Sequence, residues 1–138
     1  MTSTIAPTPR EVSLSLVDGV AKLVAGDESQ VDRLAGLYAE QTHVVYWGAP
    51  DEPFRSRDEP CARFARVPAR FSAPRFRGFR ADNIRVHETG DPELIVAEFT
   101  YVGDGDGDEP PMNLPCCFVF RVRDGEIVGS RDYVLGAG

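Results

Sequence analysis

The residues that could bind a metal or attack a substrate are few, and their spacing excludes several chemistries. Two histidines, with no Cys-x-x-Cys pair, argue against a zinc site. The run Asp104–Asp108 begins like a calcium loop, but Glu109 and Pro115 occupy the positions where that loop needs glycine and glutamate. No helix is expected after its glycines, so they form no dinucleotide fingerprint. A Gly-x-Ser-x-Gly nucleophile elbow is also absent. We expect neither a metal nor a cofactor.

The three cysteines are Cys61, Cys116 and Cys117. Their odd number and the adjacent pair argue against a secreted disulfide framework and favour a reducing cytoplasm. Cys116 could be a nucleophile, but no obvious histidine partner exists for it. We interpret it as a buried structural thiol.

Length and charge restrict the class of protein. A chain of 138 residues that is 42% hydrophobic fits one domain with a single core, which we place at residues 11–138. Residues 1–10 are interpreted as a disordered lead-in without the plan of a signal peptide. A net charge of −7 argues against nucleic-acid binding, since acidic residues flank the only basic patch, Arg75–Arg80. No apolar run is long enough to span a membrane.

The first half of the chain is predicted to be mainly helical. Apolar spacing indicates helices over residues 11–25 and 31–38, the first ended by Gly26. The valine-rich and aromatic run His43–Trp47 indicates a strand. Residues 56–70 are predicted to form a third helix that tolerates Pro60 in its first turn and ends near Pro68.

The second half is predicted to form antiparallel strands over residues 77–88, 94–102, 112–123 and 127–135. A polar loop follows the second of them, and Asp124-Gly125 is typical of a tight turn between the last two. Helices followed by strands indicate an α+β fold in which the helices cover one face of a bent sheet.

This order of elements, and several short motifs within about residues 11–135, resemble the NTF2-like superfamily in its SnoaL-like branch. The motifs are Ala25-Gly26-Asp27, Leu37-Tyr38-Ala39-Glu40, Val86-His87-Glu88-Thr89 with Asp91-Pro92-Glu93, Val96-Ala97-Glu98-Phe99, and residues 120–128 (FRVRDGEIV) with Ser130-Arg131-Asp132-Tyr133. The superfamily includes ketosteroid isomerases, polyketide cyclases, limonene-epoxide hydrolases, dehydratases and non-catalytic modules, so the resemblance specifies a fold rather than a reaction.

The resemblance implies a cone, with three helices packed on a strongly curved antiparallel or mixed sheet around an apolar pocket. It also implies a homodimer formed through the outer face of the sheet. Strand alternation then separates two sets of side chains. The set expected to face the pocket is Tyr46, Phe99, Tyr101, Cys116, Phe118 and Asp132. The set expected to face outward is Val45, Trp47, Glu98, Thr100, Val119 and Arg131, with Glu98 and Arg131 as a cross-strand ion pair.

Two chemistries of the superfamily match this sequence poorly. The catalytic positions of ketosteroid isomerases fall on Tyr46, Gly19 and Phe118, and none keeps the required chemistry. Limonene-epoxide hydrolases use an Asp-Arg-Asp set, of which Asp132 is the counterpart of the water-activating aspartate and Tyr46 of a helper tyrosine. Phe99 and Tyr101 replace the arginine and the second aspartate, so the set is incomplete.

SnoaL-type cyclases use one pocket carboxylate as a general acid/base, and Asp132 suits that role because burial raises the pKa of a carboxyl. The candidate catalytic residues are therefore Asp132, Tyr46 and Tyr101. The candidate substrate-binding residues are Leu16, Phe99, Cys116, Phe118 and Phe120. An alternative stays open, in which Asp132 only hydrogen-bonds a tyrosine or a backbone amide.

The leading hypothesis is a cofactor-independent acid/base enzyme of the cyclase, isomerase or hydrolase type that acts on a small hydrophobic molecule, such as a polyketide, terpenoid or steroid-like compound. One alternative is a non-catalytic module that binds an apolar ligand. Another is a dimerising accessory domain whose cone is closed by Phe99, Phe118 and Phe120.

Overall fold

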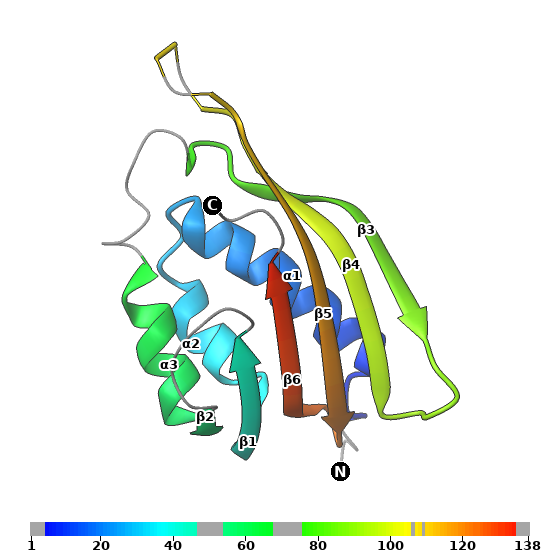
Figure 1. The fold of residues 1–138 in the computed structure, drawn as a ribbon. Helices are drawn as coiled ribbons and strands as arrows, with labels where there is room; N and C mark the ends of the chain where they lie inside the picture. Colours follow the sequence, from blue (N-terminus) through cyan, green and yellow to red (C-terminus); the bar gives the residue numbers. More distant parts are fainter. Residues whose placement is uncertain (1–4, 47–53, 68–75, 106, 109, 135–138) are drawn as a thin grey trace.

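The computed structural model describes residues 5–46, 54–67, 76–105, 107–108 and 110–134. The expected positions of Trp47 and Arg75, the end of the third helix near Pro68, and Leu135 lie outside these ranges. The described chain is mixed α+β, with three helices and a curved six-stranded sheet (Figure 1). No helix in these ranges is long and apolar enough to cross a membrane.

Helix α1 (Pro9–Val24) begins earlier than its apolar spacing suggests. The Thr8 side chain accepts a hydrogen bond from the Glu11 backbone amide, and the Glu11 side chain accepts one from the Thr8 amide. This capping box, with Pro9 in the first turn, starts the helix inside the segment that we expected to be disordered. The lead-in also contacts the fold, because a Cβ on Gly125 would lie 2.7 Å from Pro7.

The helix expected over residues 31–38 is shorter and displaced. Helix α2 (Gln30–Ala35) ends at Gly36, and Tyr38 is already the first residue of strand β1 (Tyr38–Tyr46). Leu37 and Tyr38 continue the apolar spacing of the helix, but the chain leaves the helix at Gly36, so Leu37 lies in a turn and Tyr38 is buried at the start of the strand. The spacing of a short apolar run does not distinguish these two structures.

Strand β2 (Phe54–Ser56) was not predicted, and it occupies the start of the expected third helix. Helix α3 (Asp58–Ala65) follows it, with Pro60 in the first turn as expected. The Arg57 side chain donates a hydrogen bond of 2.7 Å to the Tyr38 carbonyl and forms a 3.0 Å ion pair with Glu126, so it ties this segment to the sheet.

The four C-terminal strands agree closely with the predicted ones. They are β3 (Arg80–Glu88), β4 (Leu94–Gly103), β5 (Met112–Arg123) and β6 (Glu126–Val134). Asp124 and Gly125 both have positive φ, as the tight β5–β6 turn requires. Strand β3 begins three residues later than predicted, because the preceding residues form a turn closed by a 3.1 Å hydrogen bond from the Phe79 amide to the Phe76 carbonyl.

The sheet has the order β2-β1-β6-β5-β4-β3, in which β1 and β6 are parallel and all other neighbours are antiparallel. Helix α1 crosses its concave face, while α2 and α3 lie beside it near β1 (Figure 1). A bulge between Asp82 and Arg85 contributes to the curvature. The core lies between α1 and the inner faces of β4 and β5, where Leu16, Phe99 and Phe120 are buried.

Candidate functional site

A cavity of about 190 Å³ lies between α1, α3 and the concave face of the sheet. Its wall is mostly apolar, with polar groups from three tyrosines, one aspartate and one arginine. The lining residues are Leu16, Val20, Val24, Tyr38, Tyr46, Arg63, Phe64, Val67, Phe79, Tyr101, Leu114, Phe118, Asp132 and Val134. An apolar hollow with a few convergent polar groups is the usual form of a small-molecule site.

Asp132 is the only carboxyl group among the described residues that line this cavity. Strand β6 places it opposite Tyr46 of β1 on one side and Phe118 of β5 on the other. The residue is only 5% exposed, and its Oδ1 atom has no hydrogen-bond partner among the described residues. A buried carboxyl oxygen without a partner is unusual, because the missing hydrogen bond costs free energy.

Burial raises the pKa of Asp132 from its ordinary value of 3.8 to about 7. The apolar surroundings disfavour the charged form, and the Ser130 hydroxyl and the Arg63 guanidinium oppose this effect only in part. Among the described residues the Ser130 hydroxyl forms no hydrogen bond of regular geometry. Near neutral pH the carboxyl is therefore present in both forms, so it can either accept or donate a proton.

Two tyrosines and an arginine lie around this carboxyl. Burial raises the pKa of Tyr46 and of Tyr38, and the negative charge of Asp132 adds to the effect, so both hydroxyls remain protonated. The Arg63 guanidinium of α3 lies over the Tyr46 ring, 3.9 Å from its centroid, in a cation–π contact. These groups bring hydrogen-bond donors to the same wall as Asp132.

Tyr101 lines the cavity, but its proton is already engaged. Its hydroxyl donates a 3.0 Å hydrogen bond to the Val17 carbonyl of α1, and burial raises its pKa well above the ordinary value. Donating that proton to a substrate would break a buried hydrogen bond. The geometry therefore favours a structural role for Tyr101 over the catalytic role expected from the sequence.

The expected substrate-binding residues divide into two groups. Leu16 and Phe118 line the cavity, whereas Phe99, Cys116 and Phe120 are buried in the core and are not among its lining residues. The rings of Phe99 and Phe118 meet edge to face at 4.9 Å. Burial raises the pKa of the Cys116 thiol to about 12, in agreement with a structural thiol.

The expected alternation of the strands is confirmed in the described residues. Phe99, Tyr101, Cys116, Phe118 and Asp132 are buried on the inner face. The described members of the outward set are exposed or half-buried, and they are Val45, Glu98, Thr100, Val119 and Arg131.

The expected ion pair between Glu98 and Arg131 was wrong. Glu98 pairs instead with His87 of the neighbouring strand, at 2.7 Å. Strand β5 lies between β4 and β6 and keeps Glu98 and Arg131 apart.

Sequence reasoning missed Tyr38, Arg63, Phe64 and Phe79 as lining residues. Tyr38 was assigned to a helix, and Arg63 and Phe64 belong to a helix whose orientation the sequence does not determine. One available signal was the adjacent pair Arg63-Phe64, a charged residue next to a large apolar one on a short helix.

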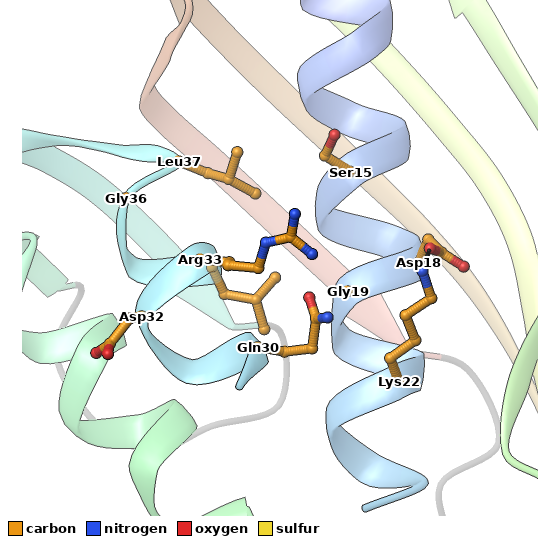
Figure 2. A pocket seen from close by; sticks show the side chains of 10 residues that line it. Ser15, Asp18, Gly19, Lys22, Gln30, Asp32, Arg33, Gly36 and Leu37 are labelled. Atoms are coloured by element: carbon orange, nitrogen blue, oxygen red, sulfur yellow. Dashed lines mark ion pairs between the residues drawn. The ribbon is translucent and has the colours of Figure 1, made fainter. Parts of the chain in front are cut away.

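A second hollow of about 490 Å³ lies between α1 and α2, and Gln30 and Arg33 extend from α2 toward α1 in it (Figure 2). It is larger, but its ionisable side chains are exposed, and Asp18 and Lys22 form an ion pair of 2.8 Å. Solvent screens exposed charges, so their interactions with one another or with a ligand are weak. We therefore place the candidate site in the smaller apolar cavity. In the described ranges no group of three or more His, Cys, Asp or Glu residues could hold a metal ion.

The family profile of the SnoaL-like domain matches residues 23–130, well over half of the chain. The chain belongs to the SnoaL-like family. The search of curated proteins finds no match to this SnoaL-like chain.

Solved structures agree with the fold. An NTF2-like protein from Anabaena variabilis is 18% identical with a TM-score of 0.70, over 100% of this chain and 97% of that one. A Pseudomonas putida protein provisionally assigned as a polyketide cyclase is 20% identical with a TM-score of 0.65, covering 93% and 92%. A Catenulispora acidiphila protein with a ketosteroid isomerase-like fold, solved with trimethylamine, is 22% identical with a TM-score of 0.57, covering 92% and 86%. At these identities the similarity concerns the fold alone.

Proposed function

We propose that this SnoaL-like protein is a cofactor-independent general acid/base enzyme that acts on a small hydrophobic molecule, with Asp132 as the group that transfers the proton. The observation that carries the proposal is a carboxyl, 5% exposed, in the wall of an apolar cavity, with one oxygen that has no hydrogen-bond partner in the described part of the chain. A ligand in the cavity would provide that partner.

The proposed step is a proton transfer at a carbon next to a carbonyl group. The Asp132 carboxylate removes the proton, the electron pair moves to the carbonyl oxygen as an enolate, and the protonated carboxyl returns the proton to the same or another carbon. Tyr46 stays protonated because burial and Asp132 raise its pKa, so its hydroxyl can donate to the developing oxyanion. Tyr101 is assigned to holding α1 against β4.

Solvent hydrogen exchange tests this step without knowledge of the physiological substrate. The protein would be incubated in deuterium oxide with 2-cyclohexenone or cyclohexanone, and deuterium incorporation beside the carbonyl would be followed by NMR. General acid/base catalysis typically contributes about 10²- to 10⁴-fold. Asp132→Asn should remove the acceleration of exchange, and Tyr46→Phe should reduce it.

The matched control is Asp18→Asn, which removes an exposed carboxyl from the other hollow. It should leave exchange unchanged. Equal exchange by Asp132→Asn and the wild type would remove Asp132 from the mechanism. If neither ketone exchanges faster than in buffer although both bind in the cavity, the non-catalytic binding module becomes the better account.

The accessory-domain alternative required a cone closed by Phe99, Phe118 and Phe120. Phe99 and Phe120 are buried in the core, and a hollow of about 190 Å³ remains beside Phe118. This geometry favours a protein that takes up a ligand.

We also propose a homodimer formed through the outer face of the sheet. A cross-strand row on that face joins Val45, Arg131, Val119 and Val96, one residue from each of four neighbouring strands. Each valine is half-buried in the single chain. Sedimentation should give a dimer for the wild type and a monomer for Val119→Glu, and a monomeric wild type would refute the proposal. Three free cysteines support a reducing, cytoplasmic setting.

A further inference from the structure

The size of the cavity limits what it can enclose. Its volume is about 190 Å³. For comparison, an engineered apolar cavity of about 150 Å³ binds one benzene molecule. One ring with a small substituent therefore fits within the wall, whereas the several fused rings of a steroid or an aromatic polyketide do not.

The charges on the wall come from two groups in the described part of the chain, the Arg63 guanidinium and the Asp132 carboxyl. Arg63 is exposed at the cavity and has no carboxylate within ion-pair distance among the described residues. The ion pairs among the described residues join side chains that do not line this cavity. Arg63 is thus a cation at the cavity wall that the ion pairs among the described residues leave available for a ligand.

The contact with Tyr46 fixes how Arg63 can bind. The central carbon of the guanidinium lies over the ring at 3.9 Å from the centroid, a distance that fits stacking of the flat guanidinium on the ring. The N–H groups point outward in the plane of the guanidinium, so stacking leaves them available. A planar fork of donors matches the two oxygens of a carboxylate better than a single carbonyl oxygen.

The buried polar group beside this arrangement is Asp132, which pairs with Tyr46 across strands β6 and β1. It is 5% exposed, lines the cavity, and its Oδ1 has no hydrogen-bond partner among the described residues. A ligand that extends from Arg63 into the cavity would reach a wall that contains this carboxyl. The site thus combines an exposed cationic group, an apolar wall and a buried acid.

From this arrangement we infer that the ligand is a small carboxylate with an apolar body of about one ring, whose carboxylate pairs with Arg63 while its body fills the cavity beside Asp132. The inference rests on the proposed function, because it concerns the same cavity. It adds the charge and the size of the molecule on which Asp132 acts.

Benzoate and benzamide test the inference, since they have the same ring and nearly the same shape but differ in charge. Binding would be measured at about pH 6, where most Asp132 side chains are protonated and do not repel the anion. The readout is the shift of the methyl resonances of Leu16 and Val20, two lining residues of α1. Benzoate should bind the wild type about tenfold more tightly than benzamide, the ratio expected of one partly exposed charge-assisted hydrogen bond.

Arg63→Gln should abolish this preference by weakening benzoate about tenfold and leaving benzamide unchanged. The matched control is Arg66→Gln, on the C-terminal end of the same helix, which removes an exposed arginine that does not line the cavity. It should keep the preference. A preference for benzoate that survives Arg63→Gln would overturn the assignment of the carboxylate to Arg63.

The outcomes also separate this inference from the proposed function. Equal binding of the two probes in the cavity, or tighter binding of benzamide, overturns the inference but leaves the acid/base proposal intact. The absence of methyl shifts with either probe contradicts both, because the cavity then takes up no one-ring ligand. If the wild type binds benzoate more tightly than benzamide but does not accelerate deuterium exchange of the ketones, only the acid/base role is refuted.

Discussion

Replacing Asp132 with asparagine should change the pH dependence of stability in a characteristic direction. In the folded protein the pKa of this carboxyl is about 7, whereas its ordinary value is 3.8. The folded state therefore holds the proton more tightly than the unfolded chain does. The contribution of this carboxyl to the unfolding free energy is fully present below about pH 4 and is lost as the pH rises through about 7. Asparagine, which carries no charge at any pH, removes that loss.

The magnitude follows from the two pKa values. A difference of about three pH units at 1.36 kcal/mol each gives a full effect of about 4 kcal/mol. At about pH 5.5 the wild type has already lost about 2 kcal/mol of the unfolding free energy that Asp132 contributes below about pH 4. At about pH 8.5 it has lost nearly all of the 4 kcal/mol. The difference in unfolding free energy between Asp132→Asn and the wild type should thus grow by about 2 kcal/mol in favour of the variant over this range.

Urea denaturation of both proteins at several values between about pH 5.5 and pH 8.5 provides the measurement. Half-buried carboxyls with lowered pKa values, such as Asp91 and Glu93, are present in both proteins and cancel in the difference. Asp18→Asn, which replaces an exposed carboxyl outside the cavity, is the control for the substitution itself. A difference that stays constant with pH would refute the reasoning, because Asp132 would then titrate alike in the folded and unfolded states.

Two further outcomes follow from the contacts of the inner face. Tyr101→Phe removes the 3.0 Å hydrogen bond to the Val17 carbonyl and should lower the unfolding free energy by about 1–2 kcal/mol in urea denaturation, while ketone exchange persists. Loss of exchange with unchanged stability would instead return Tyr101 to the mechanism. Of the three free thiols, Cys116 should be the slowest to react with a disulfide reagent at about pH 8, since it is buried and its pKa is raised to about 12. Rapid native labelling of Cys116, read by mass spectrometry, would contradict its placement.

The strands that face the cavity could be predicted well because their alternation is regular. Strand β5 has the predicted bounds, and the inward positions of Phe118 and Asp132 follow from the two-residue period of a strand. Each of these strands is long, has one buried face and ends at a clear turn, so its register is strongly specified. The candidate acid could therefore be identified from the sequence.

The features of the fold and of the candidate site that depend on long-range packing could not be predicted from the sequence. The short run around Leu37 and Tyr38 fits a helix and a strand equally well, and only pairing with β6 makes it a strand. Arg63 joins the site because α3 packs beside β1, which no local pattern encodes. The size of the cavity depends on how α1 and neighbouring aromatic rings such as Phe99 fill the cone, and periodicity carries no information on volume.

The pKa of Asp132 itself tests the central claim most directly. It can be measured by following the ¹³C resonance of the Asp132 side-chain carboxyl through a pH titration, with Asp132→Asn used to assign the signal. A buried acid in the cavity wall should titrate near pH 7, as its surroundings require. A midpoint at or below about pH 4 would show a solvated carboxylate and would contradict the account.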